Sequence, residues 1–287
     1  MKKNIIVIIT LYILLKVFLE YQEILLNINF ITLIFFKNIF PALFIFFIIS
    51  SILINYGFAE TISSIFGKTF NKIFKVNVYS SYIFFMSMLS GLPSNAKYIK
   101  ELLDKKLIDT KDASKILMFT HFANPLFILS LVKHKPYLVL IAHYIPNIII
   151  GIFLRNNNPK KYYEINFKNE NNKNLITIIS ESITTSFNIL ITILGLIIIF
   201  YTLSSLTNLN ALKYLLEMTS SIININSLNL DLKYKTMLIT GILSFGGICV
   251  HMQVFSILEK EKIRYLPYLI SRIFHFMLSI SIVYIFY

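Results

Sequence analysis

Residues 89–97, LSGLPSNAK, place helix-breaking and polar residues within an otherwise apolar part of the chain. Gly91 and Pro93 interrupt a helix, and Pro93 suits the first turn of the next one. Ser94 and Asn95 offer side-chain oxygens and amides beside the free N–H groups of that new helix. Because the positive end of the helix dipole lies here, and Lys97 adds a cation one turn later, the stretch favours anion binding. The alternative is that Lys97 only extends to the membrane surface.

A second stretch, LSFGGICVHMQ over 243–253, begins with Ser244 and repeats the same device. Gly246 and Gly247 let the backbone turn and approach a ligand closely. His251 and Gln253 offer hydrogen bonds to a solute, and His251 is also able to carry a proton, although a packed histidine is the alternative. Two such helix starts that face each other near the membrane midplane predict a site for an anion or a polar solute.

The stretch FTHFANPLF over 119–127 interrupts a third apolar segment. Pro125 frees backbone carbonyls in the preceding turn, and Asn124 is able to satisfy them or to reach a ligand. Thr120 and His121 are candidate binding residues for the same reason. Contacts between neighbouring helices are the alternative role for all of these side chains.

Two isolated charges, Glu217 and Arg272, lie in mostly apolar segments. Glu217 is a candidate for coupling a proton or Na⁺, and Arg272 is a candidate partner for Glu217 or for a solute carboxylate. The sequence contains no nucleophile elbow, phosphate-binding loop or zinc-protease motif, so we expect neither an enzyme nor a cofactor. The single cysteine, Cys249, excludes a disulfide within the chain and a cysteine-based metal centre, and we expect no metal.

The composition predicts the environment in which these segments lie. Apolar residues make up 56% of the 287 residues, and several apolar runs approach the ~20 residues that span a bilayer. We therefore predict an all-α, polytopic transmembrane protein in contact with the lipid bilayer. The net charge of +13 comes from lysines spread through loops, which does not favour nucleic acid binding. The predicted helices cover 4–19, 29–55, 78–92, 112–132, 137–154, 175–206, 236–246 and 265–286, with amphipathic stretches at 94–107 and 248–262.

Residues 89–108 and 243–263 resemble each other, since both open with Leu-Ser and a glycine and both end in an acid, Lys and Ile. The lysine distribution predicts that a hairpin over 78–108 enters from the inside and one over 236–262 from the outside. These observations predict two inverted repeats, each with a re-entrant broken-helix hairpin. The expected organisation is a transmembrane helix and linker over 1–35, repeats over 36–154 and 175–287, and a cytoplasmic loop over 155–174.

Taken together, the stretches 89–108, 113–129, 215–222 and 243–258 resemble the sporulation integral membrane protein YlbJ family, whose members carry nucleoside-recognition Gate domains. The likeness extends over about 36–287. Its specific parts are the Gly-x-Pro-x-x-Ala-Lys element at 91–97 and the Phe-Gly-Gly-x-x-Val-His-x-Gln element at 245–253. The resemblance implies Gate-like repeats and a role in endospore formation. It also implies export of dipicolinic acid across the mother-cell membrane around the forespore, which supports core dehydration and the spore cortex.

The favoured hypothesis is therefore a secondary transporter of a small anionic metabolite that works by alternating access around paired broken helices. A nucleoside permease, in which Lys97 has no part, is one alternative. A non-transporting membrane scaffold needed for spore cortex formation is another. A homo-oligomer and contacts with other sporulation membrane proteins also stay open.

Overall fold

The computed structural model describes residues 2–155, 174–206 and 210–287, and every regular element in these ranges is a helix. The predicted all-α class is confirmed. The predicted loop over 155–174 lies outside the described residues, apart from its two ends. The helices are α1 (Lys2–Leu19), α2 (Tyr21–Ile34), the π-helix η1 (Phe35–Ile39), α3 (Phe40–Asn55), α4 (Phe58–Phe74), α5 (Ser80–Ser90), α6 (Ser94–Asp104), α7 (Thr110–Phe119), α8 (Pro125–Leu131), α9 (Pro136–Phe153), α10 (Leu175–Ser205), α11 (Asn210–Leu216), α12 (Met218–Ser227), α13 (Leu232–Phe245), α14 (Gly247–Ile257) and α15 (Tyr265–Phe286).

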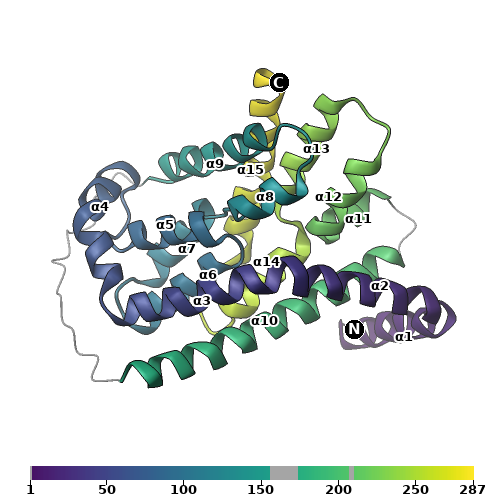
Figure 1. Cartoon of the computed structure of the whole chain (residues 1–287), viewed down its shortest axis with the longest axis horizontal. Helices are drawn as coiled ribbons and strands as arrows, with labels where there is room; N and C mark the ends of the chain where they lie inside the picture. Colours follow the sequence, from purple (N-terminus) through teal and green to yellow (C-terminus); the bar gives the residue numbers. More distant parts are fainter. Residues whose placement is uncertain (1, 156–173, 207–209) are drawn as a thin grey trace.

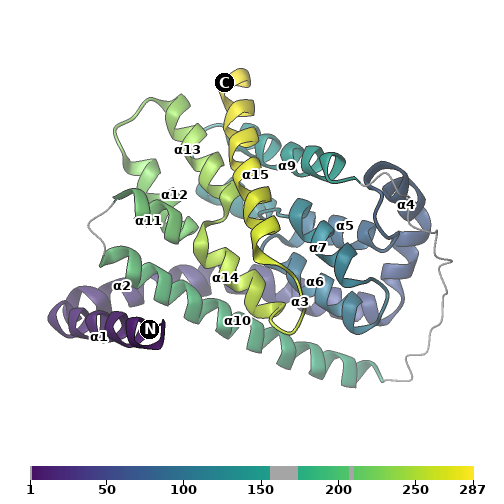
Figure 2. The ribbon, with the colours of Figure 1, turned by 180° about the vertical axis from the view of Figure 1, so that it is seen from behind.

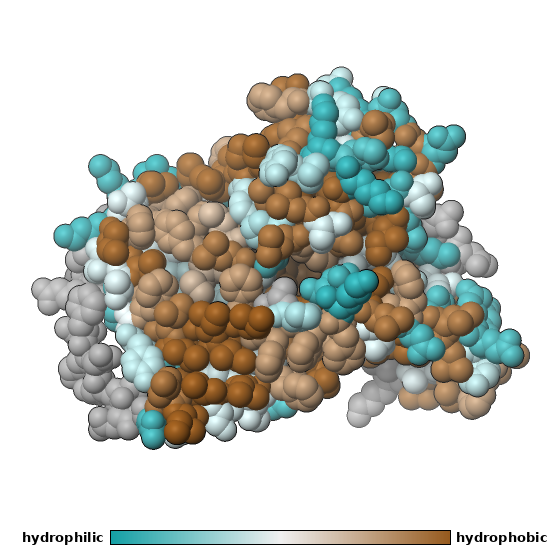
Figure 3. Space-filling view, in the orientation of Figure 1, coloured by the Kyte–Doolittle hydropathy of each residue, from teal (hydrophilic) through white to brown (hydrophobic). Residues whose placement is uncertain are grey.

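Within the described residues, four helical segments are long and apolar enough to cross a membrane, or up to six if each sharply bent pair counts as one span. The four are Pro136–Phe153, Leu175–Ser205, Leu232–Ile257 and Tyr265–Phe286. Large apolar side chains are exposed on several of these helices, and apolar groups cover much of the face shown in Figure 3. Such an apolar exterior requires a lipid surround, so the chain is a polytopic membrane protein.

The hairpin predicted over 78–108 is present in the structure. The chain reverses direction between α5 and α6 at Gly91. Asn77 Nδ2 donates to Leu107 O at 3.2 Å at the open end of this hairpin. The rings of Tyr82 and Tyr98 meet between the two helices, with centroids 5.9 Å apart. Neither α5 nor α6 is long enough to span a bilayer alone, as expected for a hairpin that dips into the membrane and returns.

The second hairpin, predicted over 236–262, is not present. Helices α13 and α14 are interrupted at Gly246 but together form one candidate span, Leu232–Ile257. The chain instead turns back between α11 and α12, where Ser221 Oγ lies 3.3 Å from Lys213 O. Since the predicted inverted repeats depended on that hairpin, they are not confirmed. The sequence analysis also missed α4 and treated α7 and α8 as one helix.

Most of the described helices belong to one of two structural units, and each unit has its own hydrophobic core. One, here called the arm, consists of α2, η1, α3 and α10, and its core includes Phe35, Phe47 and Leu190. Figures 1 and 2 show α10 antiparallel to α2–α3 along the outside of the molecule. The other, here called the body, holds the hairpins and interrupted helices from α4 to α15 outside α10, around a larger core. Cys249 of α14 packs into the core of the arm and so marks the boundary.

Glycines bring the helix breaks of the body into direct contact. Gly91 has φ +82°, and a Cβ there would lie 2.4 Å from Asn124 N. A Cβ on Gly246 would lie 2.7 Å from His121 Nε2, and one on Gly247 would lie 3.2 Å from Leu216 O. The break between α5 and α6 therefore touches the break between α7 and α8. This second break also touches the one between α13 and α14. The break between α13 and α14 in turn touches the one between α11 and α12. Only glycine permits this backbone approach.

This packing predicts that Gly91→Ala lowers the free energy of unfolding by about 2 kcal/mol or more, because alanine combines an unfavourable φ with a clash. Thermal unfolding of the purified chain in detergent measures the effect. Gly195→Ala is the matched control, since Gly195 lies in α10 with no atom within 4 Å of the position of a Cβ. We expect that change to be neutral or slightly stabilising. Equal effects of the two substitutions would contradict the close packing of the breaks.

Candidate functional site

A cavity of about 350 Å³ lies between the arm and the body. Its arm side comes from η1, the start of α3 and the middle of α10. Its body side comes from three of the helix breaks and from α14. The lining residues are Lys37, Asn38, Ile39, Pro41, Leu43, Leu92, Pro93, Ala123, Asn124, Leu126, Phe127, Ser130, Ile193, Ile197, Glu217, Met218, Thr219, Val250 and Gln253. Such a size and such a mainly apolar wall with a few polar groups are typical of a small-solute site.

Four of the predicted site residues line this cavity, namely Pro93, Asn124, Glu217 and Gln253. They come from four different segments that lie far apart in the sequence. The hypothesis that broken helices meet around a shared space is therefore supported for these four positions. The remaining predicted residues lie elsewhere, and two of them, His251 and Arg272, bond to backbone carbonyls at the ends of interrupted helices.

Asn124 both caps a helix and closes a hairpin tip. Its Oδ1 accepts hydrogen bonds from Leu126 N at 2.8 Å and Phe127 N at 3.4 Å, at the start of α8. Its Nδ2 lies 3.2 Å from Leu89 O and 3.3 Å from Ser90 O, the carbonyls that end α5. One amide side chain thus satisfies both sides of the contact between two breaks. The part of Asn124 that faces the cavity is held in place by these bonds.

Glu217 is a buried carboxylate at the cavity wall, with 2% of its surface exposed. Its two oxygens accept from Thr219 N at 2.9 Å and Ser220 N at 2.7 Å, at the N-terminus of α12. The helix dipole and these two N–H groups compensate its negative charge. Glu217 is thus the buried N-cap of α12.

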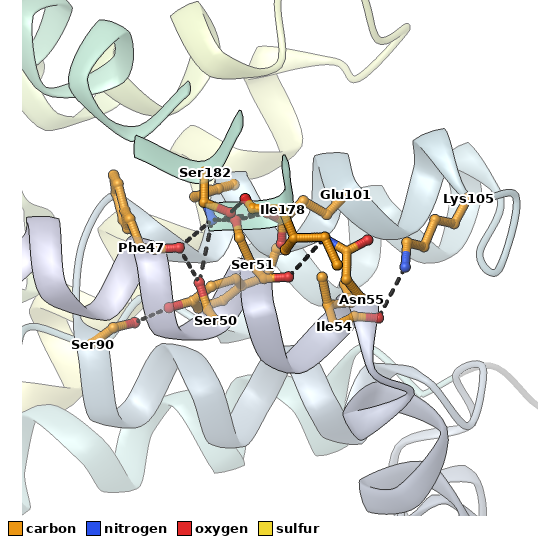
Figure 4. Close-up of polar contacts among 12 residues, drawn as sticks. Phe47, Ser50, Ser51, Ile54, Asn55, Ser90, Glu101, Lys105, Ile178 and Ser182 are labelled. Atoms are coloured by element: carbon orange, nitrogen blue, oxygen red, sulfur yellow. Dashed lines mark hydrogen bonds and ion pairs between the residues drawn. The ribbon is translucent and has the colours of Figure 1, made fainter. Parts of the chain in front are cut away.

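Lys97 lies away from the cavity, contrary to the expectation that it completes an anion site there. Its ammonium donates to Phe47 O at 3.0 Å, Ser51 Oγ at 2.8 Å and Glu101 Oε1 at 2.8 Å, with Ser50 Oγ at 3.2 Å. Figure 4 shows Ser50 and Ser51 on α3 beside Glu101 on α6. Because this ammonium is buried and already has oxygen acceptors, it joins the hairpin to the arm.

The same face of α6 continues this contact one turn further on. Lys105 Nζ donates to Ile54 O at 2.9 Å, and Ser51 Oγ donates to Glu101 Oε1 at 2.9 Å. Burial lowers the pKa of Lys105, and the carboxylates of Glu60 and Glu101 oppose that shift. The arm and the hairpin are therefore held together by polar contacts with α3 carbonyls and hydroxyls.

Ser94 and Asn95 start α6 as predicted and are fully buried, but neither lines the cavity. Among the described residues, no hydrogen-bond partner is present for Ser94 Oγ or for either amide atom of Asn95. Thr120 donates its hydroxyl to Ile116 O at 2.8 Å, one turn earlier in α7. These three side chains contribute to the packing of the breaks, and the structure assigns them no contact with the cavity.

The predicted histidine His251 is fixed by its two neighbours. Its Nε2 lies 2.9 Å from Phe245 O, so this nitrogen carries the hydrogen, and Nδ1 accepts from Tyr265 OH at 3.0 Å. Both nitrogens are occupied, and His251 caps the end of α13 rather than facing the cavity. His121 Nδ1 lies 3.2 Å from Tyr268 OH, while its Nε2 faces Gly246. The packing alternative therefore holds for His251.

Ser244 belongs to a hydrogen-bonded chain at the centre of the body. Ala123 N donates to His143 Nε2 at 2.9 Å, so His143 Nδ1 donates to Ser244 Oγ at 2.9 Å. Ser244 Oγ in turn lies at hydrogen-bond distance, 2.7 Å, from Ser279 Oγ. This chain links the α7–α8 break to α9, α13 and α15, and it satisfies an N–H group that has no helical partner.

Arg272 does not pair with Glu217, contrary to the sequence-based expectation. Its guanidinium is fully buried and donates to Met118 O near the end of α7 and to His275 Nδ1, at 2.9 Å for the histidine. His275 Nε2 in turn donates to His143 O at 2.8 Å. The arginine thus satisfies freed backbone of the body, and no carboxylate lies within ion-pair distance of it in the described residues.

Sequence reasoning missed Lys37, Asn38 and Thr219 as cavity residues. Lys37 and Asn38 lie on the π-helix η1, a form that often marks functional positions. A signal for Lys37 was present, since it is the single charged residue between Glu23 and Glu60. Thr219 lies two residues after the capping Glu217, so the same start of a helix pointed to it.

The geometry of Lys97 predicts that Lys97→Ala lowers the free energy of unfolding by about 3 kcal/mol, because it leaves the Glu101 carboxylate and buried hydroxyls without their cation. Lys100→Ala is the matched control on the same helix, because Lys100 is 35% exposed and its acidic neighbours are at least 3.5 Å away. That change should cost about 0.5 kcal/mol or less. Thermal unfolding in detergent compares the two, and a larger loss for Lys100 would refute the assignment.

The comparisons with known proteins agree with this architecture. No family model matches the chain, and no solved structure matches it. Sporulation integral membrane protein YlbJ of Bacillus subtilis (strain 168) is 25% identical to the chain, over 82% of this chain and 70% of the relative. That coverage includes most of the hairpins and interrupted helices described above, in a chain with several membrane-spanning candidates. The chain is therefore similar over most of its length to a sporulation integral membrane protein, and this similarity supports the resemblance to the YlbJ family.

Proposed function

We propose that the protein is a secondary transporter of a small anionic metabolite and that the cavity between arm and body is its binding site. The observation that carries the proposal is the convergence of helix breaks on this one cavity. Interrupted helices cost backbone hydrogen bonds in a membrane, and they are tolerated where they line a polar space or are buried in protein. Transporters use such breaks to surround a solute with backbone and side-chain polar groups.

The two-body construction supports alternating access as the mechanism. The cavity has one wall on the arm and one on the body, and these bodies have separate cores. A movement of the arm against the body would open the cavity and leave most of each core intact, with Cys249 and Ile54 at the boundary between the two. The arm–hairpin contact through Lys97 would have to be broken in that movement, so it belongs to the closed arrangement.

By resemblance to the YlbJ family, the proposed cargo is dipicolinic acid and the proposed location is the mother-cell membrane that surrounds the forespore. Dipicolinic acid is a small planar dicarboxylate, and a cavity of about 350 Å³ is large enough to hold it. No catalytic step is part of the proposal.

A nucleoside is the second candidate, since the amide side chains of Asn124 and Gln253 also suit neutral bases and ribose hydroxyls. Phe127 is the aromatic residue among the described lining residues, which leaves little surface for base stacking. The composition of the wall therefore favours the anion over the nucleoside.

The proposal predicts that proteoliposomes containing the chain take up radiolabelled dipicolinate above the level of protein-free vesicles. Filling the cavity should abolish uptake, so Ile193→Phe, at a buried position of the cavity wall, should reduce the rate at least about tenfold. Ile199→Phe is the matched control on the same helix, because Ile199 is 53% exposed on the outside of α10. Its uptake should equal that of the unmodified chain.

Competition identifies the cargo class in the same assay. Inhibition by unlabelled dicarboxylates but not by uridine supports the anion, and the reverse result supports the nucleoside. If neither compound is taken up under any ion gradient while the protein is inserted, the transport proposal is overturned and the scaffold alternative gains support.

A further inference from the structure

We propose that Lys37 is the residue that binds the anionic group of the transported solute. This inference rests on the proposed transport function and deepens it, because it assigns the carboxylate of the solute to one side chain. Four observations on the described residues lead to it, namely the position of Lys37 in the sequence, its depth, its direction and the charges around it.

Lys37 is isolated within a long apolar run. Between Glu23 and Glu60 the chain contains no other Asp, Glu, Lys or Arg. Lysine near the centre of a membrane segment costs free energy, and such residues usually face a water-filled space or a ligand. The position therefore calls for an interaction that a lipid-facing lysine does not have.

Contacts with α10 place Lys37 at the middle of a candidate span. The rings of Phe40 and Phe187 lie 6.5 Å apart, and those of Phe30 and Tyr201 lie 6.1 Å apart. Since α2–α3 and α10 are antiparallel (Figure 1), Lys37 is level with a residue between Phe187 and Tyr201. Residues Leu175–Ser205 form one candidate span, so Lys37 lies near its centre.

The π-helix directs this residue to the cavity. An extra residue in one helical turn rotates the side chains that follow it, and η1 covers Phe35–Ile39. Phe35 at the start of η1 packs in the core of the arm, whereas Lys37 and Asn38, two and three residues further on, line the cavity. Lys37 is exposed there, so its ammonium is accessible to a solute.

The charge of Lys37 is not matched by the protein. In the described part of the chain, no carboxylate oxygen lies within ion-pair distance of its Nζ. Glu217 lines the same cavity, but its oxygens accept from two N–H groups of α12. Lys97, the other lysine considered for this role, is already bound to α3 and Glu101. Lys37 is therefore the cation available to an anion in the cavity.

Kinetics in proteoliposomes test the assignment. Lys37→Gln should raise the KM for dipicolinate about tenfold or more, because a charge-assisted hydrogen bond is lost, and leave the maximal rate within about twofold. Lys37→Arg should keep most of the affinity. Lys72→Gln, which removes an exposed lysine of α4 outside the cavity, is the matched control and should behave like the unmodified chain.

Chemical rescue separates charge from structure. In the background Cys249→Ser, which removes the single native cysteine, Lys37→Cys should lose dipicolinate affinity. Treatment with 2-aminoethyl methanethiosulfonate restores an ammonium at residue 37 and should restore the low KM. Treatment with the neutral methyl methanethiosulfonate should not. Equal recovery with both reagents, or none with the charged one, would overturn the role of Lys37.

The failure of this inference is distinguishable from that of the proposed function. If the unmodified chain transports dipicolinate and Lys37→Gln has the same KM, the transport proposal stands and the Lys37 assignment falls. If the unmodified chain shows no uptake, thermal unfolding of the purified chain with and without dipicolinate tests whether Lys37 still binds the anion. A rise in melting temperature that Lys37→Gln abolishes retains the assignment as a binding site, and the absence of any rise overturns it.

Discussion

Backbone groups freed at helix breaks are the constraint on which this structure depends. An apolar bilayer cannot accept unpaired N–H and C=O groups, so each break must find partners within the protein. Asn124 supplies them for the ends of α5 and α8, and His251 supplies one for the end of α13. Arg272 binds the carbonyl of Met118 near the end of α7. The buried polar side chains of the body are thus explained first by the backbone that surrounds them.

These hydrogen bonds to the backbone determine which polar side chains remain available to a solute. A histidine with both nitrogens engaged, or a lysine that already binds several oxygens, would lose those bonds on turning to a ligand. Under the proposed function, the polar groups that bind the solute are instead those that line the cavity and are not fully engaged, such as Lys37, Thr219 and Gln253. Burial and polarity together therefore do not mark the site in this protein. Unused bonding capacity marks it only together with a place in the cavity wall, since Ser94 and Asn95 have such capacity but do not line the cavity.

The sequence predicted the helix breaks well because glycine and proline act locally. Gly91 with Pro93, and Gly246, each interrupt a helix where expected, whereas the break before Pro125 divides a segment that was predicted as one helix over 112–132. It failed where the outcome depends on a distant partner. Whether the chain reverses or continues after Gly246 depends on contacts with His121 and with α11–α12, which no local pattern encodes. The direction of Lys97 likewise depends on α3, about fifty residues earlier. Lys37 stood out as the single charge between Glu23 and Glu60, but its place in the cavity wall depends on segments distant in the sequence.

The two lysines illustrate how one residue type serves two purposes in the same protein. Lys97 is surrounded by oxygens from two helices, and its charge is consumed in holding hairpin and arm together. Lys37 lies in the arm wall of the cavity, where η1 turns it from the core of its own body. With Glu217 compensated by the start of α12, the free charge of the cavity is positive. A dicarboxylate would place one carboxylate at this ammonium and meet its other with neutral donors such as Gln253, so a single cation on the arm would set both the orientation of the solute and its preference for anions.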